Sequence, residues 1–225
     1  MRWTEVAGVV VVVLAVLVWW VWVAASRLDR LHRKVGASRS VVQAQLVRRA
    51  TVAAELATSG LLDPVSSVLV GEAAWSALAA DSAVARPDVP PELLSLLLSD
   101  PRSSGERALS SPTGDGPPTL DELREERGQV ESELSATLRA VLDDRDEIAA
   151  MRSLPGGDEL LDALSSAWYR AEIARRFHNE AVLQTQRVRR GRLVRVLRLA
   201  GHAPEPRTLE LDDAWPGALA RPGVG

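Results

Sequence analysis

The hydrophobic pattern of this chain is dominated by one long apolar run near its start. From Val6 to Ser26 no residue is charged, and the run reads VAGVVVVVLAVLVWWVWVAAS. At a helical rise of about 1.5 Å per residue the run extends roughly 31 Å, which is enough to cross the hydrocarbon core of a bilayer. The tryptophans near its C-terminal end favour the membrane interface. The pattern predicts a transmembrane anchor over residues 1–26.

The length and the flanks of this run predict whether it is cleaved and how it is oriented in the membrane. A cleaved signal peptide is the alternative to an anchor, but its apolar core is usually only about 7–15 residues long. Arg2 is the only basic side chain on the N-terminal flank. The positive-inside rule therefore predicts a single-pass protein of the cytoplasmic membrane, with its N-terminus outside and the bulk of the chain in the cytoplasm. The basic residues of the C-terminal flank are Arg27, Arg30, Arg33, Lys34 and Arg39.

Beyond the run, apolar residues recur at alternating steps of three and four, which is the spacing of one face of a helix. The first such helix is predicted over 26–59, and its stripe has a polar middle formed by Ser38, Gln45 and Arg49. The apolar members of this stripe are Leu28, Leu31, Val35, Val42, Val52 and Leu56. Further helices are predicted over 63–81, 90–99, 119–153 and 158–200.

Residues typical of helix ends support these boundaries. Gly60 and Gly201 stand where a helix stops, because glycine tolerates the left-handed conformation that commonly follows a last turn. Asp63 before a proline is expected to cap the second helix. Thr119 forms a capping box with the glutamate three residues later. Asp158 is expected to cap the last helix after the break at 155–157.

Together these elements predict an all-α protein, with a single N-terminal transmembrane helix followed by an antiparallel helical bundle of long and short helices over residues 27–200. Short turns favour antiparallel neighbours in such a bundle. The stretch 100–118 is rich in Ser, Gly and Pro and has no periodicity, which predicts a mobile loop. Four prolines in residues 201–225 predict an extended or disordered tail.

Composition narrows the fold further. Apolar residues make up 46% of the chain but aromatic residues only 4%, and a core of Leu, Val and Ala suits helix packing better than a β-sandwich. The chain has no cysteine, which excludes disulfides, cysteine metal sites and cysteine nucleophiles. The net charge of −3 argues weakly against general nucleic-acid binding.

Two motifs resemble the LemA family. In that family a membrane segment is followed by a helix with QL-x-RR near its middle, and here Gln45, Leu46, Arg48 and Arg49 occupy those positions. The stretch IARRFHNEAV at 173–182 is similar to the family's ARRFY element on its last long helix, with a histidine where the family usually has tyrosine. The matching residues of this second motif are Arg175, Arg176, Phe177, Asn179, Ala181 and Val182.

The resemblance covers about a quarter of the chain, although the order of the span and the helices also agrees with the family. The aromatic–asparagine pair at the start of the family's first helix is missing, which marks this chain as a divergent member. The resemblance implies a membrane-anchored helical bundle, and it implies no established enzymatic activity.

Side chains suited to chemistry do not form a recognisable catalytic or metal-binding arrangement in the sequence. No histidine has metal-ligand spacing, and His178, Asn179 and Glu180 occupy adjacent helical positions that point in different directions. Serine catalysis lacks the GxSxG motif. An acidic cluster lacks the glycine and the spacing of a calcium loop, and we interpret it as a solvated helix face. We predict no enzyme, no metal and no cofactor. The acidic cluster comprises Asp143, Asp144, Asp146 and Glu147.

A basic amphipathic segment, RVRRGRLVRVLRLAGH, lies at 187–202. Its face is interpreted in three ways: a solvated face of a bundle helix, contact with the anionic inner membrane surface, or nucleic-acid binding, which is the weakest because no recognised fold supports it. A last helix that returns toward the bilayer would bring this segment beside the first basic cluster. The predicted membrane-surface contacts are Arg27, Arg30, Arg33, Lys34, Arg187, Arg190, Arg192, Arg195 and Arg198.

Three function hypotheses follow from the sequence. The first is a non-catalytic adaptor or scaffold that holds an unidentified protein partner at the inner face of the membrane. The second is an enzyme or accessory subunit acting on envelope or lipid precursors, which would need a pocket lined by residues 63–118. The third is self-association into a homo-oligomer through a coiled coil formed by the stripe of 26–59.

Overall fold

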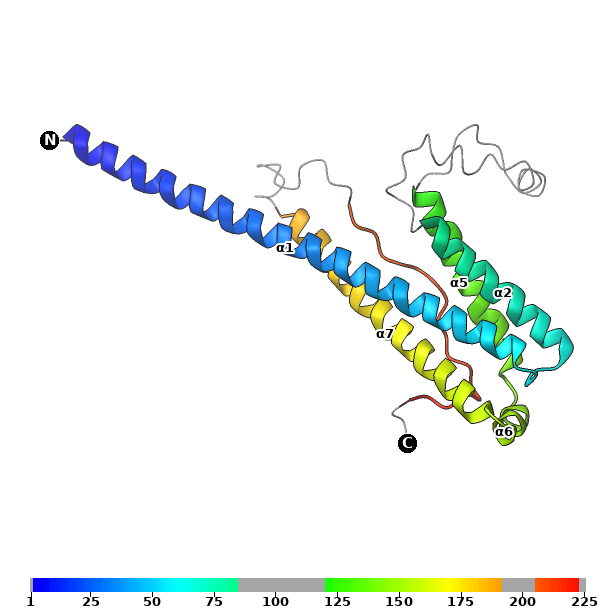
Figure 1. The fold of residues 1–225 in the computed structure, drawn as a ribbon. Coiled ribbons are helices and arrows are strands. Elements are labelled where there is room, and N and C mark those ends of the chain that lie inside the picture. The colour runs from blue at the N-terminus through cyan, green and yellow to red at the C-terminus, as the bar shows by residue number, and fades with distance from the viewer. Residues whose placement is uncertain (1, 85–119, 192–204, 223–225) are drawn as a thin grey trace, which may run out of the picture. The chain divides into compact units, whose positions relative to one another are not determined.

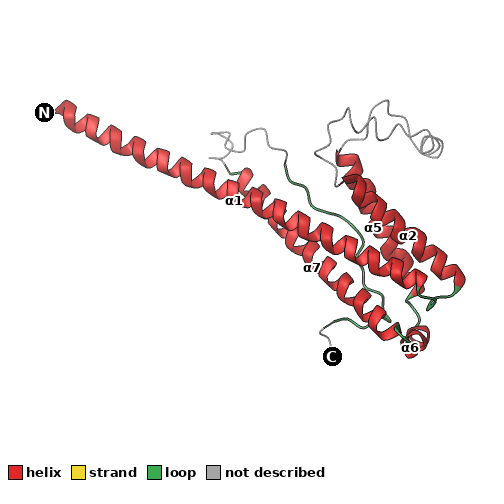
Figure 2. Cartoon of the chain, in the orientation of Figure 1, coloured by secondary structure: helices red, strands yellow, loops and turns green. Residues whose placement is uncertain are grey.

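The computed structural model describes residues 2–84, 120–191 and 205–222, and within these ranges every helix or strand is an α-helix (Figure 2). The all-α class predicted from the sequence is therefore confirmed for the described part of the chain. The predicted helix at 90–99, the predicted loop at 100–118 and the predicted cap at Thr119 lie outside the described residues.

The predicted anchor and the predicted first helix form one continuous helix, α1 (Arg2–Thr58, 57 residues; Figure 1). Its inward stripe is confirmed, since Val42, Val52 and Leu56 are buried. The chain leaves α1 through Gly60, whose φ of 76° lies in the left-handed region that glycine tolerates.

Helix α2 (Pro64–Val84) begins with the predicted cap. The Asp63 carboxylate accepts hydrogen bonds from the backbone N–H of Val65 at 2.9 Å and of Ser66 at 3.2 Å. Hydrogen bonds from the Ser66 side chain and backbone stabilise the charged form and lower the pKa of Asp63. The helix ends three residues later than predicted.

The single helix predicted over 119–153 is wrong, because the structure has two helices there, α5 (Leu120–Val141) and α6 (Arg145–Ser153). Asp144 has extended backbone angles and its carboxylate accepts the N–H of Asp146 at 2.7 Å, so it caps α6. Aspartate competes with helical hydrogen bonding through such local bonds. The break allows Leu142 and Ile148, on either side of it, both to be buried.

Helix α7 (Gly157–Arg189) differs from the prediction at both ends. It begins before Asp158, which lies in the first turn and is not the cap, and the carbonyl of Gly156 accepts the N–H of Leu160 at 3.1 Å. It ends at Arg189, where a turn interrupts the predicted helix and the Gly191 N–H donates to the Val188 carbonyl at 3.1 Å. Glycine in a helix interior costs about 1 kcal/mol relative to alanine. Residues 192–204 lie outside the described part of the chain.

The chain divides into two compact units. Unit 1 comprises Met1–Leu46 and Ala167–Glu210. In it, the part of α1 that follows the apolar run and the C-terminal part of α7 lie side by side and run in opposite directions (Figure 1). Ser38 on α1 contacts His178 on α7, and this contact sets the register between the two helices.

Unit 2 comprises Val47–Ser166 and Leu211–Gly225. Helices α2 and α5 pack against each other in it. A 2.6 Å ion pair joins Asp81 in the last turn of α2 to Arg127 near the start of α5, as expected for antiparallel helices. Fully buried apolar side chains of the unit include Ala53, Leu56, Val70, Ala74, Leu134, Leu138, Leu142, Leu161 and Leu164.

Of the tail that was expected to be extended or disordered, the structure describes residues 205–222. This segment has no regular secondary structure, but within each unit it is hydrogen-bonded to helices. In unit 1 the Asn179 amide exchanges two hydrogen bonds with the backbone of Leu209, at 2.8 and 3.1 Å. In unit 2 Asp212 pairs with Arg139 at 2.6 Å, and Leu219 is buried. Side-chain partners on the helices satisfy backbone groups that proline-rich chain cannot pair with itself.

The start of α7 generates the first prediction. A Cβ added to Gly157 would lie 1.9 Å from the backbone carbonyl oxygen of Met151 and 2.8 Å from its carbon, so the G157A backbone must shift. We expect Gly157→Ala to lower the free energy of unfolding by about 1–3 kcal/mol, as overpacked sites do. Thermal unfolding of the full chain in detergent, followed by circular dichroism, measures this loss.

Gly36→Ala is the matched control, because a Cβ there has nothing within 4 Å. Its alanine should raise stability by up to about 1 kcal/mol through helix propensity. Equal melting temperatures for both variants would contradict the steric argument.

Candidate functional site

The exposed apolar surface of the chain is concentrated at the start of α1. Every described side chain from Val6 to Trp20 is exposed, and Trp19, Trp20 and Trp22 are each more than 60% exposed. Among the described helices, α1 is the one that is long and apolar enough to cross a membrane, by length and composition. No other described residue covers this apolar surface. A bilayer interior is an environment in which such a surface is stable.

Basic side chains follow the apolar run directly. Arg27, Arg30 and Lys34 are exposed on α1, and Arg33 forms an ion pair with Asp29 one turn earlier. The first of these residues comes one position after the apolar run, so the cluster spans roughly 12 Å of helix from the end of that run.

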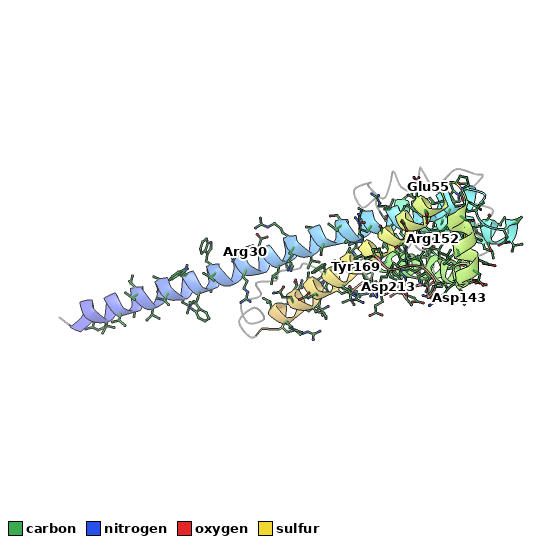
Figure 3. The ribbon with its side chains drawn as sticks, turned by 90° about the horizontal axis from the view of Figure 1, so that it is seen from below. Arg30, Glu55, Asp143, Arg152, Tyr169 and Asp213 are labelled. Atoms are coloured by element: carbon green, nitrogen blue, oxygen red, sulfur yellow. The ribbon has the colours of Figure 1, made fainter. Side chains whose placement is uncertain are left out.

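The end of α7 contributes further arginines to the same end of unit 1. His178 lies beside Ser38, and the two helices are antiparallel, so Arg187 stands level with Asp29, nine residues from the contact in each direction. Arg30 lies close to the level at which α7 ends (Figure 3). Arg190 is 4.0 Å from Glu205, and both side chains are largely exposed. The helix pair therefore gathers basic residues from both helices at one end, which we call the basic end.

Not all of the predicted contacts can be placed. The described members of the basic end are Arg27, Arg30, Arg33, Lys34, Arg187 and Arg190, whereas Arg192, Arg195 and Arg198 lie outside the described residues. Contact with lipid remains a prediction for all of these residues.

His178 and Ser38 form the one described pair that resembles a base and a nucleophile. The Ser38 hydroxyl donates to the carbonyl of Val35 at 2.9 Å. The Nδ1 atom of His178 lies 3.0 Å from Ser38 Oγ. The Ser38 hydroxyl therefore lies within hydrogen-bond distance of both groups, and the histidine tautomer decides whether Nδ1 donates or accepts. The pair joins α1 to α7 within unit 1.

Burial governs the ionisation of this histidine. Desolvation, and to a lesser extent the positive charge of Arg39, lower the pKa of His178. Asn179 and Glu180 do not join it, since the Asn179 amide binds the backbone of Leu209 and Glu180 is exposed. The predicted divergence of these three adjacent residues is confirmed.

The first LemA-like motif contains the most deeply buried charge of unit 2. Arg49 is fully buried, and its guanidinium donates to the Glu131 carboxylate at 2.8 Å, to the Glu131 carbonyl at 3.1 Å and to the Ser135 hydroxyl at 2.9 Å. Glu131 is only 1% exposed, so both charges of the pair are removed from water. The neighbouring Arg48 is exposed, although both arginines belong to the same motif.

Sequence reasoning missed Glu131 as the partner of Arg49, because the two residues lie 82 positions apart along the chain. Glu131 lies three residues before Leu134 and seven before Leu138, so it occupies the buried stripe of its own helix. That spacing is the signal that could have found it. Of the remaining motif residues, Leu46 is buried, whereas the Gln45 Oε1 atom is buried with no hydrogen-bond partner among the described residues.

The second motif divides into anchoring and exposed residues. Ala181 and Val182 are buried, and Asn179 binds the tail. Arg176 is exposed and pairs with Glu172 at 2.6 Å. Phe177 is 65% exposed, and Arg175 is half-buried.

The acidic cluster at 143–147 functions as a helix start, because Asp144 caps α6 and Asp146 and Glu147 lie in its first turn. In the part of the chain that the structure describes, no group of three or more His, Cys, Asp or Glu side chains is arranged to hold a metal ion. In comparisons with known proteins, neither a family model nor a curated protein nor a solved structure matches the chain.

The buried pair of Arg49 and Glu131 generates a stability prediction. Arg49→Met leaves a buried carboxylate without its partner, and we expect it to lower the free energy of unfolding by about 3–5 kcal/mol. Adding Glu131→Leu should recover part of this loss, because the second substitution removes the unpaired charge. Denaturant unfolding of the full chain in detergent measures all variants.

Arg48→Met is the control, since it changes the same charge one residue away on an exposed side chain. It should shift stability by no more than about 0.5 kcal/mol. A double variant as unstable as the sum of its single variants would show that the two charges are not coupled.

The lowered pKa of His178 predicts a pH dependence of stability. Above an unfolded-state pKa of about 6.5 both states are neutral, and below it the unfolded chain binds the proton first, so stability falls as the pH decreases. We expect a loss of up to about 1 kcal/mol between pH 7.5 and 5.5 from this residue. His178→Asn keeps a donor near Ser38 but cannot titrate, so its stability should be less pH-dependent. Identical pH profiles of the two proteins would contradict the assignment.

Proposed function

We propose that the chain is a membrane-anchored, non-catalytic helical scaffold or adaptor, which holds a protein partner at the inner face of the cytoplasmic membrane. The observation that carries this proposal is the exposed apolar N-terminal part of α1. The same helix continues without a break into a part that packs against other helices and contains polar residues. A bilayer removes that surface from water, while the remainder of α1 continues into the aqueous phase.

The basic end supports both the anchoring and its orientation. Arg27 and Arg30 follow the apolar run directly, and the antiparallel register adds Arg187 at the same level. Each basic side chain near an anionic leaflet contributes about 1 kcal/mol of attraction, which is screened beyond a Debye length of about 8–10 Å. The cytoplasmic leaflet is the anionic one, so the basic end belongs on that side.

Two further observations favour a scaffold over catalysis. His178 and Ser38 contact each other between two packed helices, and Arg49 is held in a buried ion pair. The LemA-like motifs have the same character, because Leu46, Arg49, Asn179 and Val182 all contribute to packing or to internal hydrogen bonds. We therefore propose that the chain is a divergent LemA-like protein whose motif residues maintain its helical framework.

The membrane proposal is tested with a chain that lacks residues 1–26. This shortened chain should still sediment with anionic vesicles but not with neutral ones. Changing Arg27, Arg30 and Arg187 to Gln should weaken anionic vesicle binding roughly a hundredfold at low salt, from about 1 kcal/mol for each arginine. In cell fractionation, high salt should release the shortened chain from the membrane fraction, whereas the full-length protein should remain in it.

The matched control changes Arg48, Arg145 and Arg170 to Gln, which removes the same charge from exposed positions elsewhere. This control should lose little binding, since these residues lie outside the basic end. An equal loss in both triple variants would mean that the basic end is no contact site. A full-length protein found in the soluble fraction would overturn the anchor itself.

A further inference from the structure

Helix α2 has an apolar side chain on nearly every side, which is unusual for a helix at the surface of an aqueous domain. One side is buried in unit 2, with Val70, Ala74 and Ala77 at most 1% exposed. The opposite side should then be polar, but it is also apolar. Its large side chains are Val65 at 68%, Val68 at 67%, Leu69 at 50% and Trp75 at 64% exposed.

These side chains form one continuous face. Val65, Val68 and Leu69 recur at steps of three and four, and Trp75 follows at the same helical phase, with the small side chains of Ser76 and Ala79 beside it. From residue 65 to residue 79 the face extends roughly 21 Å along the helix. This length suits a partner helix of about four turns, packed ridge into groove. We call this surface the α2 face.

The exposed charged side chains on the α2 face and on its neighbour α5 are acidic in the described part of the chain, and the arginines of α5 are partly or fully buried. Glu72 is exposed at the midpoint between Val65 and Ala79, and it is the one charged side chain of the face. On α5, which packs against α2, the exposed charged side chains are all glutamates. They are Glu122, Glu125, Glu126 and Glu133.

This charge distribution discriminates between occupants. A second copy of the chain, pairing α2 with α2 about a two-fold axis, would bring the two Glu72 carboxylates together at the centre of an apolar contact, because residue 72 is the midpoint of the face. An anionic lipid surface would meet Glu72 and the glutamates of α5, and like charges repel. Both occupants are therefore disfavoured by the same side chains.

We propose that the α2 face binds an amphipathic helix of another protein, with an apolar ridge against Leu69 and Trp75 and an Arg or Lys paired with Glu72. Helices bind other proteins in this way through anchors spaced at i, i+3, i+4 and i+7. Basic side chains on the flanks of the partner meet the glutamates of α5, which provides specificity and faster association. This inference rests on the proposed scaffold function, since it identifies the surface on which the scaffold holds its partner.

The test uses the full-length protein in the cells that produce it, with a photo-reactive phenylalanine analogue placed at Leu69. The same analogue at Thr51, exposed on α1 in the same unit, is the matched control. We expect cross-linking at position 69 to exceed the control at least tenfold, and the cross-linked peptide to come from a different protein. That peptide must have helical apolar spacing and a net positive charge. Glu72→Lys should reduce the yield at least tenfold, whereas Glu72→Gln should reduce it less.

Every other outcome overturns the proposal. Cross-links to a second copy of the chain identify a homo-oligomer, cross-links to lipid identify a membrane contact, and a neutral or acidic peptide contradicts the charge argument. A yield no higher than at Thr51 means that the face has no partner. Trp75→Ser, which removes an exposed apolar anchor, should lower the yield while leaving the unfolding temperature nearly unchanged.

Failure of this inference is separable from failure of the anchor. Fractionation of the same cells reports whether the protein is in the membrane, independently of what is cross-linked at position 69. A membrane-bound protein with no cross-link at the α2 face retains the anchor and loses this docking surface. A soluble protein with the expected cross-link retains the docking surface and loses the anchor.

Discussion

The buried guanidinium of Arg49 is the interaction on which unit 2 depends most. A charge removed from water has to be paired and hydrogen-bonded, and here the partners all come from one turn of α5, through the side chain and carbonyl of Glu131 and the hydroxyl of Ser135. The planar guanidinium can donate these hydrogen bonds in few other geometries. The pair therefore fixes the position of this part of α1 relative to α5. Helix α5 in turn contributes Arg127 to the ion pair with Asp81 on α2. The polar contacts of α5 therefore set the register of two helices that packing by Ala and Leu alone would leave less defined.

Periodicity predicted most of the helices because each helix of this chain has an apolar side that the core requires. The stripe of α1 was predicted with its polar middle, and Ser38 and Arg49 indeed face inward. What the pattern lacked was the identity of their partners, since Glu131 and His178 lie far away along the chain. The break between α5 and α6 was missed for a different reason. An aspartate on a predicted helix face is compatible with solvent exposure and with capping, and only the backbone at Asp144 decides between them.

The composition of the tail did not reveal that it binds to the helices. Prolines prevent regular structure, but they do not prevent an extended chain from binding to helices that offer side-chain partners. Asn179 provides both a donor and an acceptor to Leu209, and Arg139 binds the carboxylate of Asp212, whose pKa is lowered chiefly by that hydrogen bond. The Trp215 indole donates to the carbonyl of Leu219 at 2.8 Å, and Arg221 lies over its ring at 5.2 Å. The contacts of the tail with Asn179 and Arg139 join residues 30 and 73 positions apart, which is too distant for local propensity to reveal them.

The described part of the chain has an apolar surface on α1 and another on α2, and the charges of each distinguish the environments they require. The surface of α1 from Val6 to Val23 contains no ionisable group, so nothing in it opposes transfer into hydrocarbon, and basic residues border it. The α2 face contains Glu72 at its centre and lies on a helix that packs against the acidic α5. A carboxylate in hydrocarbon costs several kcal/mol, whereas opposite an arginine at a protein interface it contributes to specificity. The first surface is therefore suited to lipid and the second to a protein helix, which is the combination that a membrane-bound scaffold needs.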